Sequence, residues 1–168
     1  YRYNDINKKF MLDFIYKTYW SNKNQMCSYE VSNNGETIIY GEPYKDSGKV
    51  LTLKYNSVTK TWTNQELFSP ITSGLRDFGK DPDLSHDGLT LITGSPAADT
   101  NKKGRLDIWE WSSSTSQFIH VQNLENPMSI SDGSDSAYWS DTSGISGDGS
   151  TIIVKSGHIG YLHVYKKD

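Results

Sequence analysis

The sequence has a single cysteine, three methionines and five prolines among its 168 residues. Because Cys27 is alone, the chain has neither an internal disulfide framework nor a cysteine-based zinc site. We interpret Cys27 as a small buried residue rather than a nucleophile. No apolar run reaches the length of a membrane-spanning helix and no signal peptide is recognisable, so the sequence predicts no membrane span.

Concentrated positive charge is also missing. The chain has 17 Lys and Arg against 20 Asp and Glu, a net charge of −3, and its basic runs are pairs such as Lys102-Lys103. Nucleic acid binding needs a dense positive face that displaces counterions, so this class of partner is disfavoured and we predict no nucleic acid. No G-x-x-x-x-G-K-[ST] loop for phosphate occurs either.

Aromatic and turn-forming residues are plentiful instead. The chain contains 11 Tyr, 5 Trp and 14 Gly, while only 35% of its residues are hydrophobic. Aromatic rings fit the pleated, half-buried surface of a sheet, and glycine with Ser, Asn and Thr forms turns. This composition predicts an all-β fold.

One pattern of turn and strand occurs three times, as "SNNGETIIYGEP" (32 to 43), "SHDGLTLITGSP" (85 to 96) and "SGDGSTIIVKSG" (146 to 157). Asn-Gly and Asp-Gly suit tight hairpins because both central positions tolerate positive φ. We therefore assign Gly35, Gly88 and Gly149 to structural turns. Repeats of this length indicate a repeated structural unit.

Each turn and strand is followed by a second, glycine-led strand: "GKVLTLKY" from Gly48, "GRLDIWEW" from Gly104 and "GYLHVYKK" from Gly160. The first two units continue alike, through "TKTWTNQEL" and "TSQFIHVQNL". Four antiparallel strands at a period of roughly 50 residues are typical of a propeller blade. We predict one propeller-like repeat domain over 1–168, with a strand segment at 1–26 and repeats at 27–68, 76–124 and 136–168.

The third unit ends after its third strand. Residues 16–26, "YKTYWSNKNQM", resemble "TKTWTNQEL", with Trp20 in the place of Trp62. A propeller closes when one terminus completes the blade begun by the other, so an N-terminal strand is expected to complete the last blade. A helix over 10–20 is the alternative, because its apolar residues fit either period.

The second unit carries a family resemblance. Its Phe78-Gly79 and Gly94-Ser95-Pro96 stand where the motif of FG-GAP repeats, the blades of integrin-α-like propellers, has its defining residues. The first unit keeps Gly41-Glu42-Pro43 without the Phe-Gly pair, and the third keeps the turn without the proline. The resemblance implies propeller blades and says little about activity. Three blades are too few to close a ring, so we expect an oligomer or a larger assembly.

Calcium is the metal that the resemblance suggests, because blades of this family often carry an acidic calcium loop. In the segment 99–107, Asp99, Asn101, Gly104 and Asp107 have the spacing of an acidic calcium loop, but Lys103 stands at one ligand position. Asp81, Asp83 and Asp87 precede the Gly-Ser-Pro element without the full spacing, and 131–136 is another acidic turn. We interpret these residues as turn-forming and predict no cofactor, with calcium disfavoured.

Catalytic patterns are missing from the sequence. The four histidines are His86, His120, His158 and His163, and they show neither an H-E-x-x-H motif nor paired zinc spacing. Ser146 lies outside the G-x-S-x-G order of a nucleophile elbow. The sequence therefore predicts that the protein is not an enzyme.

Four aromatic residues are candidates for a binding face: Trp109, Trp111, Tyr138 and Trp139. Aromatic side chains are enriched at protein contacts and stack on sugars. Packing between blades is the default interpretation for each tryptophan, because neighbouring sheets must bury their faces.

These observations predict a non-catalytic protein-binding or structural module at a particle or cell surface, of capsid-associated or adhesion type. The expected partner is protein, in a homo-oligomer or larger assembly, and the expected location is extracellular or on a virion. One alternative is a carbohydrate-binding lectin propeller with one aromatic pocket per blade, from Trp20, Trp62 and Phe118. A propeller glycoside hydrolase is the other.

Overall fold

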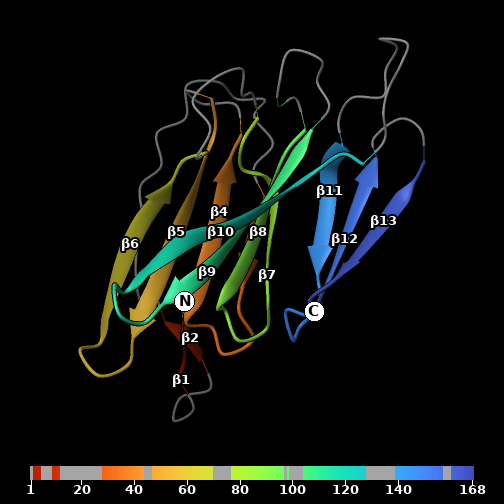
Figure 1. Cartoon of the computed structure of the whole chain (residues 1–168). Helices are drawn as coiled ribbons and strands as arrows, with labels where there is room; N and C mark the ends of the chain where they lie inside the picture. Colours follow the sequence, from red (N-terminus) through yellow and green to blue (C-terminus); the bar gives the residue numbers. More distant parts are fainter. Residues whose placement is uncertain are drawn as a thin grey trace.

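The computed structural model describes residues 2–4, 9–11, 28–43, 47–69, 77–96, 98, 104–127, 139–156 and 160–168. These residues form strands, turns and connecting segments, and no helix is found among them (Figure 1). The prediction of an all-β fold is confirmed.

Three antiparallel sheets contain most of the strands, and in each the strands pair in chain order. The first sheet consists of β3 (Tyr29–Val31), β4 (Thr37–Glu42), β5 (Lys49–Asn56) and β6 (Thr61–Leu67). The second consists of β7 (Lys80–Leu84), β8 (Thr90–Ser95), β9 (Arg105–Ser112) and β10 (Gln117–Glu125). The third consists of β11 (Trp139–Ile145), β12 (Thr151–Ser156) and β13 (Leu162–Lys166).

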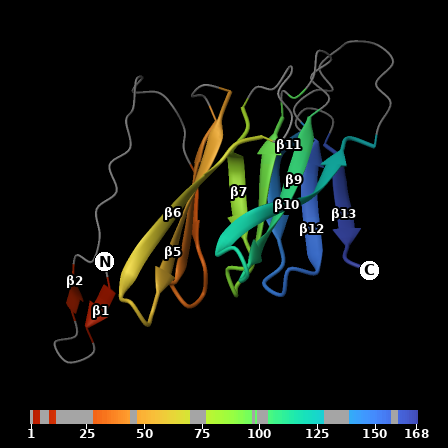
Figure 2. The same ribbon diagram turned by 60° about the vertical axis from the view of Figure 1, so that its left-hand side comes forward.

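A separate hairpin lies near the N-terminus. Its strands, β1 (Arg2–Asn4) and β2 (Lys9–Met11), pair with each other, on the opposite side of the molecule from β13 (Figure 2). These two strands therefore do not complete the third sheet. Residues 12–27, on which the strand and helix alternatives differ, lie outside the described residues.

The three sheets stack face to face (Figure 2). Two layers of buried side chains lie between them. The stacking begins at the first strand of each sheet, where β7 packs against β3 and β4, and β11 against β7 and β8. The first layer consists of Ile39, Val50, Leu67, Phe78, Leu84, Leu91, Trp109 and Phe118. The second layer consists of Ile92, Leu106, Ile108, Trp139, Ile152 and Val154.

The second sheet contributes to both layers because its side chains alternate between its two faces. Leu91 of β8 points into the first layer and Ile92 into the second. Two consecutive apolar residues in this strand thus indicate a sheet that is covered on both faces. The third sheet has a covered face only toward the second, within the part of the chain that the structure describes.

The three turns have the same backbone hydrogen bonds. In Ser32–Thr37, Ser85–Thr90 and Ser146–Thr151, the glycine N–H donates to the serine carbonyl at 2.8 to 2.9 Å. The threonine N–H donates to the serine hydroxyl at 2.9 Å in each turn. Each turn glycine has a positive φ of 69° to 72°, which L side chains rarely adopt.

The turns are also joined to one another, at the lower end of the sheets in Figure 1. The N–H of Asn33 donates to the carbonyl of His86 at 2.9 Å, and the N–H of His86 donates to the carbonyl of Gly147 at 2.8 Å. These residues occupy the second position of their turns. The sheets are therefore repeated in their mutual arrangement as well as in their internal structure.

The turn carboxylates make stability depend on pH. The hydroxyl of Ser146 and the N–H and hydroxyl of Ser150 hydrogen-bond to Asp148 and lower its pKa from 3.8 to about 2. A carboxyl with a depressed pKa stabilises the fold above its unfolded pKa and loses this effect as the pH falls toward 2. We expect Asp148→Asn to lose less stability than wild type between pH 4 and 2. Urea unfolding across this pH range measures it, and equal slopes would contradict it.

Candidate functional site

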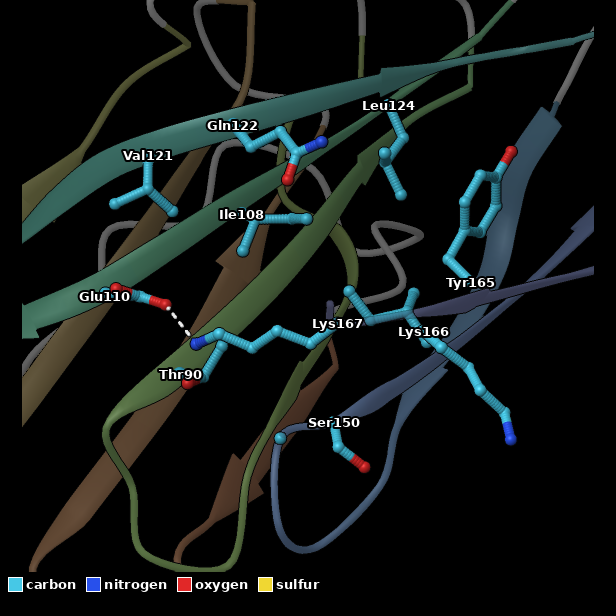
Figure 3. A pocket seen from close by; sticks show the side chains of 12 residues that line it. Thr90, Ile108, Glu110, Val121, Gln122, Leu124, Ser150, Tyr165, Lys166 and Lys167 are labelled. Atoms are coloured by element: carbon cyan, nitrogen blue, oxygen red, sulfur yellow. Dashed lines mark hydrogen bonds and ion pairs between the residues drawn. The ribbon is translucent and has the colours of Figure 1, made fainter.

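A groove of about 150 Å³ lies between the second and third sheets, near the edge strand β13 (Figure 3). Strands β8, β9 and β10 form one wall, and β12, β13 and the turn between β11 and β12 form the other. The groove lies where a fourth strand of the third sheet would cover β10. Among the described residues, no such strand is found.

The inner wall of the groove is apolar. Its apolar side chains are Ile108, Val121, Leu124, Ile152 and Tyr165. Val121 of β10 is 45% exposed, although β10 pairs with β9 along one of its edges. Burial raises the pKa of Tyr165 above its ordinary value, so this phenol stays neutral at physiological pH. The groove therefore offers an apolar surface that includes the neutral phenol of Tyr165.

Polar residues surround this apolar wall. At the turn end, Lys167 donates to Glu110 at 2.9 Å, and Figure 3 shows this pair crossing the end of the groove. Both side chains are largely exposed, so the pair adds little stability. Gln122 of β10 extends its amide toward the groove (Figure 3).

The corresponding place between the first and second sheets is filled by a strand. There Gln65 of β6 donates through Nε2 to the carbonyl of Phe118 at 2.9 Å, and its Oε1 accepts from the N–H of Phe118 at 2.8 Å. Gln65 lies opposite Thr52 of β5, and Gln122 lies opposite Ile108, which has the same place in β9. Gln122 thus repeats Gln65 without a strand beside it in the described residues.

Neither glutamine was among the residues that the sequence analysis singled out. A signal was present, because Gln65 and Gln122 each stand two residues before a leucine near the end of the fourth strand, Leu67 or Leu124. The pattern has a structural meaning only in the stacked sheets, where Gln65 contacts the backbone of the next sheet. Within one sheet, both side chains look like ordinary polar residues of a strand.

The aromatic residues predicted to bind a ligand do not share a solvent face. Trp109 lies in the first layer of buried side chains, with Trp111 packed against that layer. Trp139 is 0% exposed and lies in the second layer. Tyr138 lies outside the described residues. This corrects the expected binding face, because two of the rings are enclosed between different pairs of sheets.

The aromatics that recur along the sequence are also packed. Phe118 is 2% exposed and contacts Trp111, with ring centroids 5.4 Å apart. Trp62 is half-buried against Tyr55 at 5.3 Å. Trp20 lies outside the described residues. No open pocket of repeated aromatics is found in the described sheets, so nothing here favours the lectin alternative.

The acidic residues considered for calcium bind backbone groups instead. Asp83 accepts from the N–H of Ile145 at 2.7 Å, and Asp81 accepts from the N–H of Ser143 at 3.3 Å. Both carboxylates of β7 thereby hold β11 of the next sheet. Asp87 caps its own turn through Ser85, whose hydroxyl lowers the pKa of Asp87. No cluster of three metal-binding side chains occurs among the residues whose placement is described.

A buried charged cluster lies within the second sheet. Asp107 is 0% exposed and accepts from Arg105 Nε at 2.9 Å, and His120 Nε2 lies 2.9 Å from the same oxygen. Burial raises the pKa of Asp107, while the Arg105 guanidinium opposes that shift. Arg105 and His120 thus both pair with this carboxylate inside the second sheet.

The remaining candidates for catalysis have local roles. His86 lies in the second turn, where its backbone joins the neighbouring turns. His163 Nδ1 accepts from the indole N–H of Trp139 at 3.0 Å. The Ser146 hydroxyl donates to Asp148 within its own turn. Asp99, Asn101, His158 and the acidic turn 131–136 lie outside the described residues.

None of the described residues forms a helix with the length and apolarity that crossing a membrane requires. A scan against models of known protein families and a search of curated proteins each found no match.

Solved structures do resemble this chain. A protein from Lactobacillus plantarum matches with a TM-score of 0.56 and 15% identity, over 84% of this chain and 37% of that one. TolB from Acinetobacter baumannii covers 84% of this chain and 44% of its own length at 13% identity, with a TM-score of 0.35 that carries no argument. The chain thus spans less than half the length of either protein. The match to the Lactobacillus plantarum protein supports a β-propeller-like all-β fold, and the described sheets do not close into a ring.

Proposed function

We propose that this chain is a non-catalytic, protein-binding or structural module of propeller blades, which associates by continuing its stack of sheets. The partner that we propose is a second copy of this chain, placed against the outer face of the third sheet. We define this outer face by Ile153, Leu162 and Val164.

The observation that carries the proposal is a set of equivalent positions whose residues are buried in the first and second sheets and exposed in the third. Ile39, Ile92 and Ile153 occupy the same place in successive sheets and are 0%, 0% and 41% exposed. Val50 and Leu106 are both buried, while their counterpart Leu162 is 61% exposed. The register of strand pairing places these residues together on one face of each sheet. The third sheet thus presents the surface that its two predecessors bury.

The turn end of the stack has matching free ends. Gly88 and Gly149 lie against Thr37 and Thr90 of the preceding sheet, whereas nothing described lies within 4 Å of a Cβ placed on Gly35. The hydrogen-bonded series of turns begins at Asn33 and ends at Gly147 among the described residues. A head-to-tail contact between copies continues this series, and such heterologous contacts build rings or filaments.

Lys155 distinguishes the outer face from the two covered faces. Gly41 and Gly94 precede it at the same place, and a Cβ there would overlap the carbonyl oxygen of Gly79 or Ser140 of the next sheet. Lys155 is exposed and prevents so close an approach. The contact between copies is therefore looser at this point, which limits its affinity.

The FG-GAP resemblance and the surface location remain part of the proposal. Phe78-Gly79 and Gly94-Ser95-Pro96, which carry the resemblance, come together because the N–H of Gly79 donates to the carbonyl of Gly94 at 3.1 Å. This hydrogen bond joins the start of β7 to β8, so both motifs hold the first two strands of the blade together. The polar composition is the ground for a place at a particle or cell surface.

Self-association tests the proposal directly. We expect Val164→Glu, which puts a charge at the centre of the outer face, to weaken self-association at least about tenfold because the contact buries that charge. Val58→Glu is the control, since Val58 is 87% exposed in a turn. Sedimentation velocity over a concentration series measures both. A wild-type protein that stays monomeric at millimolar concentration would overturn the proposal.

The opposite change gives a second test with the opposite sign. Lys155→Gly restores the residue type found at Gly41 and Gly94, so we expect several-fold tighter association despite a loss of about 0.5–1 kcal/mol of strand stability. The same sedimentation series measures it. Unchanged or weaker association would show that the next sheet does not pack as the first two pairs do.

A further inference from the structure

We propose that the groove between the second and third sheets binds an extended polypeptide segment, which adds a fourth strand beside β13. The segment presents an aromatic residue opposite Lys167, and Gln122 hydrogen-bonds its backbone. This inference goes beyond the proposed function, because it concerns the covered face and edge of the third sheet rather than its outer face.

The first argument is the open edge. In the first and second sheets, the third strand lies between two partners, since β5 pairs with β4 and β6, and β9 pairs with β8 and β10. In the third sheet, β13 pairs with β12 alone within the described residues. An edge strand presents unpaired N–H and C=O groups that accept an added strand, and this is a common way of binding peptides.

The second argument is the glutamine. Between the first two sheets, the Gln65 amide satisfies both backbone groups of Phe118 in the neighbouring fourth strand. Gln122 has the same register position one sheet later, and it is exposed and directed toward the groove (Figure 3). The interface already present in the chain thus shows what Gln122 is placed to bind: the N–H and C=O of one residue in an extended strand.

The third argument fixes the side chain of that residue. Trp62 lies opposite Tyr55, and Phe118 lies opposite Trp111. Lys167 follows at the same place in the third unit, and its side chain faces the second sheet, as its contact with Glu110 shows. A residue opposite Lys167 therefore points into the groove. The apolar wall there suits an aromatic ring, as the first layer suits Phe118.

A synthetic peptide with the sequence of residues 116–125, SQFIHVQNLE, is the probe, because it is the fourth strand of the second sheet. The full chain is used with Val164→Glu, so that self-association does not compete. We expect saturable binding and slowed hydrogen exchange of the β13 backbone. N-methylation of the peptide phenylalanine and Gln122→Ala in the protein should each weaken binding on the order of tenfold, since each removes hydrogen bonds of the same pair. Combining them should add little.

Gln117→Ala is the matched control, because Gln117 lies on the same strand and outside the groove. It should leave the peptide affinity unchanged. Binding that is absent at millimolar peptide, or that ignores both Gln122→Ala and N-methylation, would overturn the inference. Slow exchange of the β13 edge in the free chain would do so as well, because the edge would then be occupied by the chain itself. A wild-type monomer that still binds the peptide would remove only the proposed function.

Discussion

Replacing Gly104 by alanine is expected to lower the free energy of unfolding by about 2–5 kcal/mol. Gly104 has φ of +79°, where an L side chain costs about 1–2 kcal/mol. A Cβ there would also overlap the carbonyl oxygen of Trp139 and lie 2.9 Å from its N and C atoms. Backbone atoms cannot rotate away, so the second and third sheets must separate, which costs roughly 1–3 kcal/mol more.

The chain supplies its own control for this substitution. Gly160 has the same place in the third unit and φ of +71°, but nothing described lies within 4 Å of a Cβ placed on it. Gly160→Ala should therefore cost only the backbone strain, about 1–2 kcal/mol. Gly48→Ala should resemble Gly104→Ala, because its Cβ would overlap the carbonyl of Phe78. Urea unfolding measures all three, and equal losses at Gly104 and Gly160 would contradict the role given to the contact between sheets.

The repeat was predictable because its turns depend on local chemistry. Ser85, Asp87 and Gly88 form their hydrogen bonds within six residues, so the sequence pattern and the structure coincide there. The glycine-led strands were predictable for the same reason, since each strand of a sheet pairs with the strands next to it in the sequence. Nothing in these signals depends on how one sheet meets the next.

The roles of side chains between sheets were not predictable in this way. The alternation of "LDIWEW" shows that Trp109 and Trp111 share a face of β9, but not which sheet covers that face. Gln65 and Gln122 have the same place in their strands, yet one is bonded to a neighbouring strand and the other faces a groove. The difference arises from what stands next in the stack, which is a long-range property.

The buried Asp107 shows the same limit. Its spacing from Asp99 raised the question of calcium, whereas the fold turns it inward onto Arg105 and His120. The Asp107 carboxylate is paired through Oδ1 with a cationic partner two residues away on the same strand face. The sequence contains both residues, but only burial makes their pairing necessary.

Replacing Trp139 by alanine is expected to cost about 3–5 kcal/mol, the range for deleting a fully buried aromatic side chain. Trp139 is 0% exposed, and its ring contacts those of His163 and Tyr165 at 6.1 and 6.4 Å between centroids. Its indole N–H also donates to His163 Nδ1 at 3.0 Å. Because Trp139 begins β11 and lies in the layer beneath the second sheet, its loss should loosen the third sheet before the others.

Two further measurements test the role of Trp139: one separates its packing from its hydrogen bond, and the other shows how far its effect spreads between sheets. Trp139→Phe keeps an aromatic ring in the layer and removes the donor to His163, so it should cost less than Trp139→Ala, about 1–3 kcal/mol. Hydrogen exchange of Trp139→Ala should accelerate in β11 to β13 while β4 and β5 keep their protection, because stacked sheets contact only their neighbours. Exchange that accelerates equally in all three sheets would show that the stack unfolds as one unit. The second layer would then transmit stability as fully as the strand pairing within each sheet.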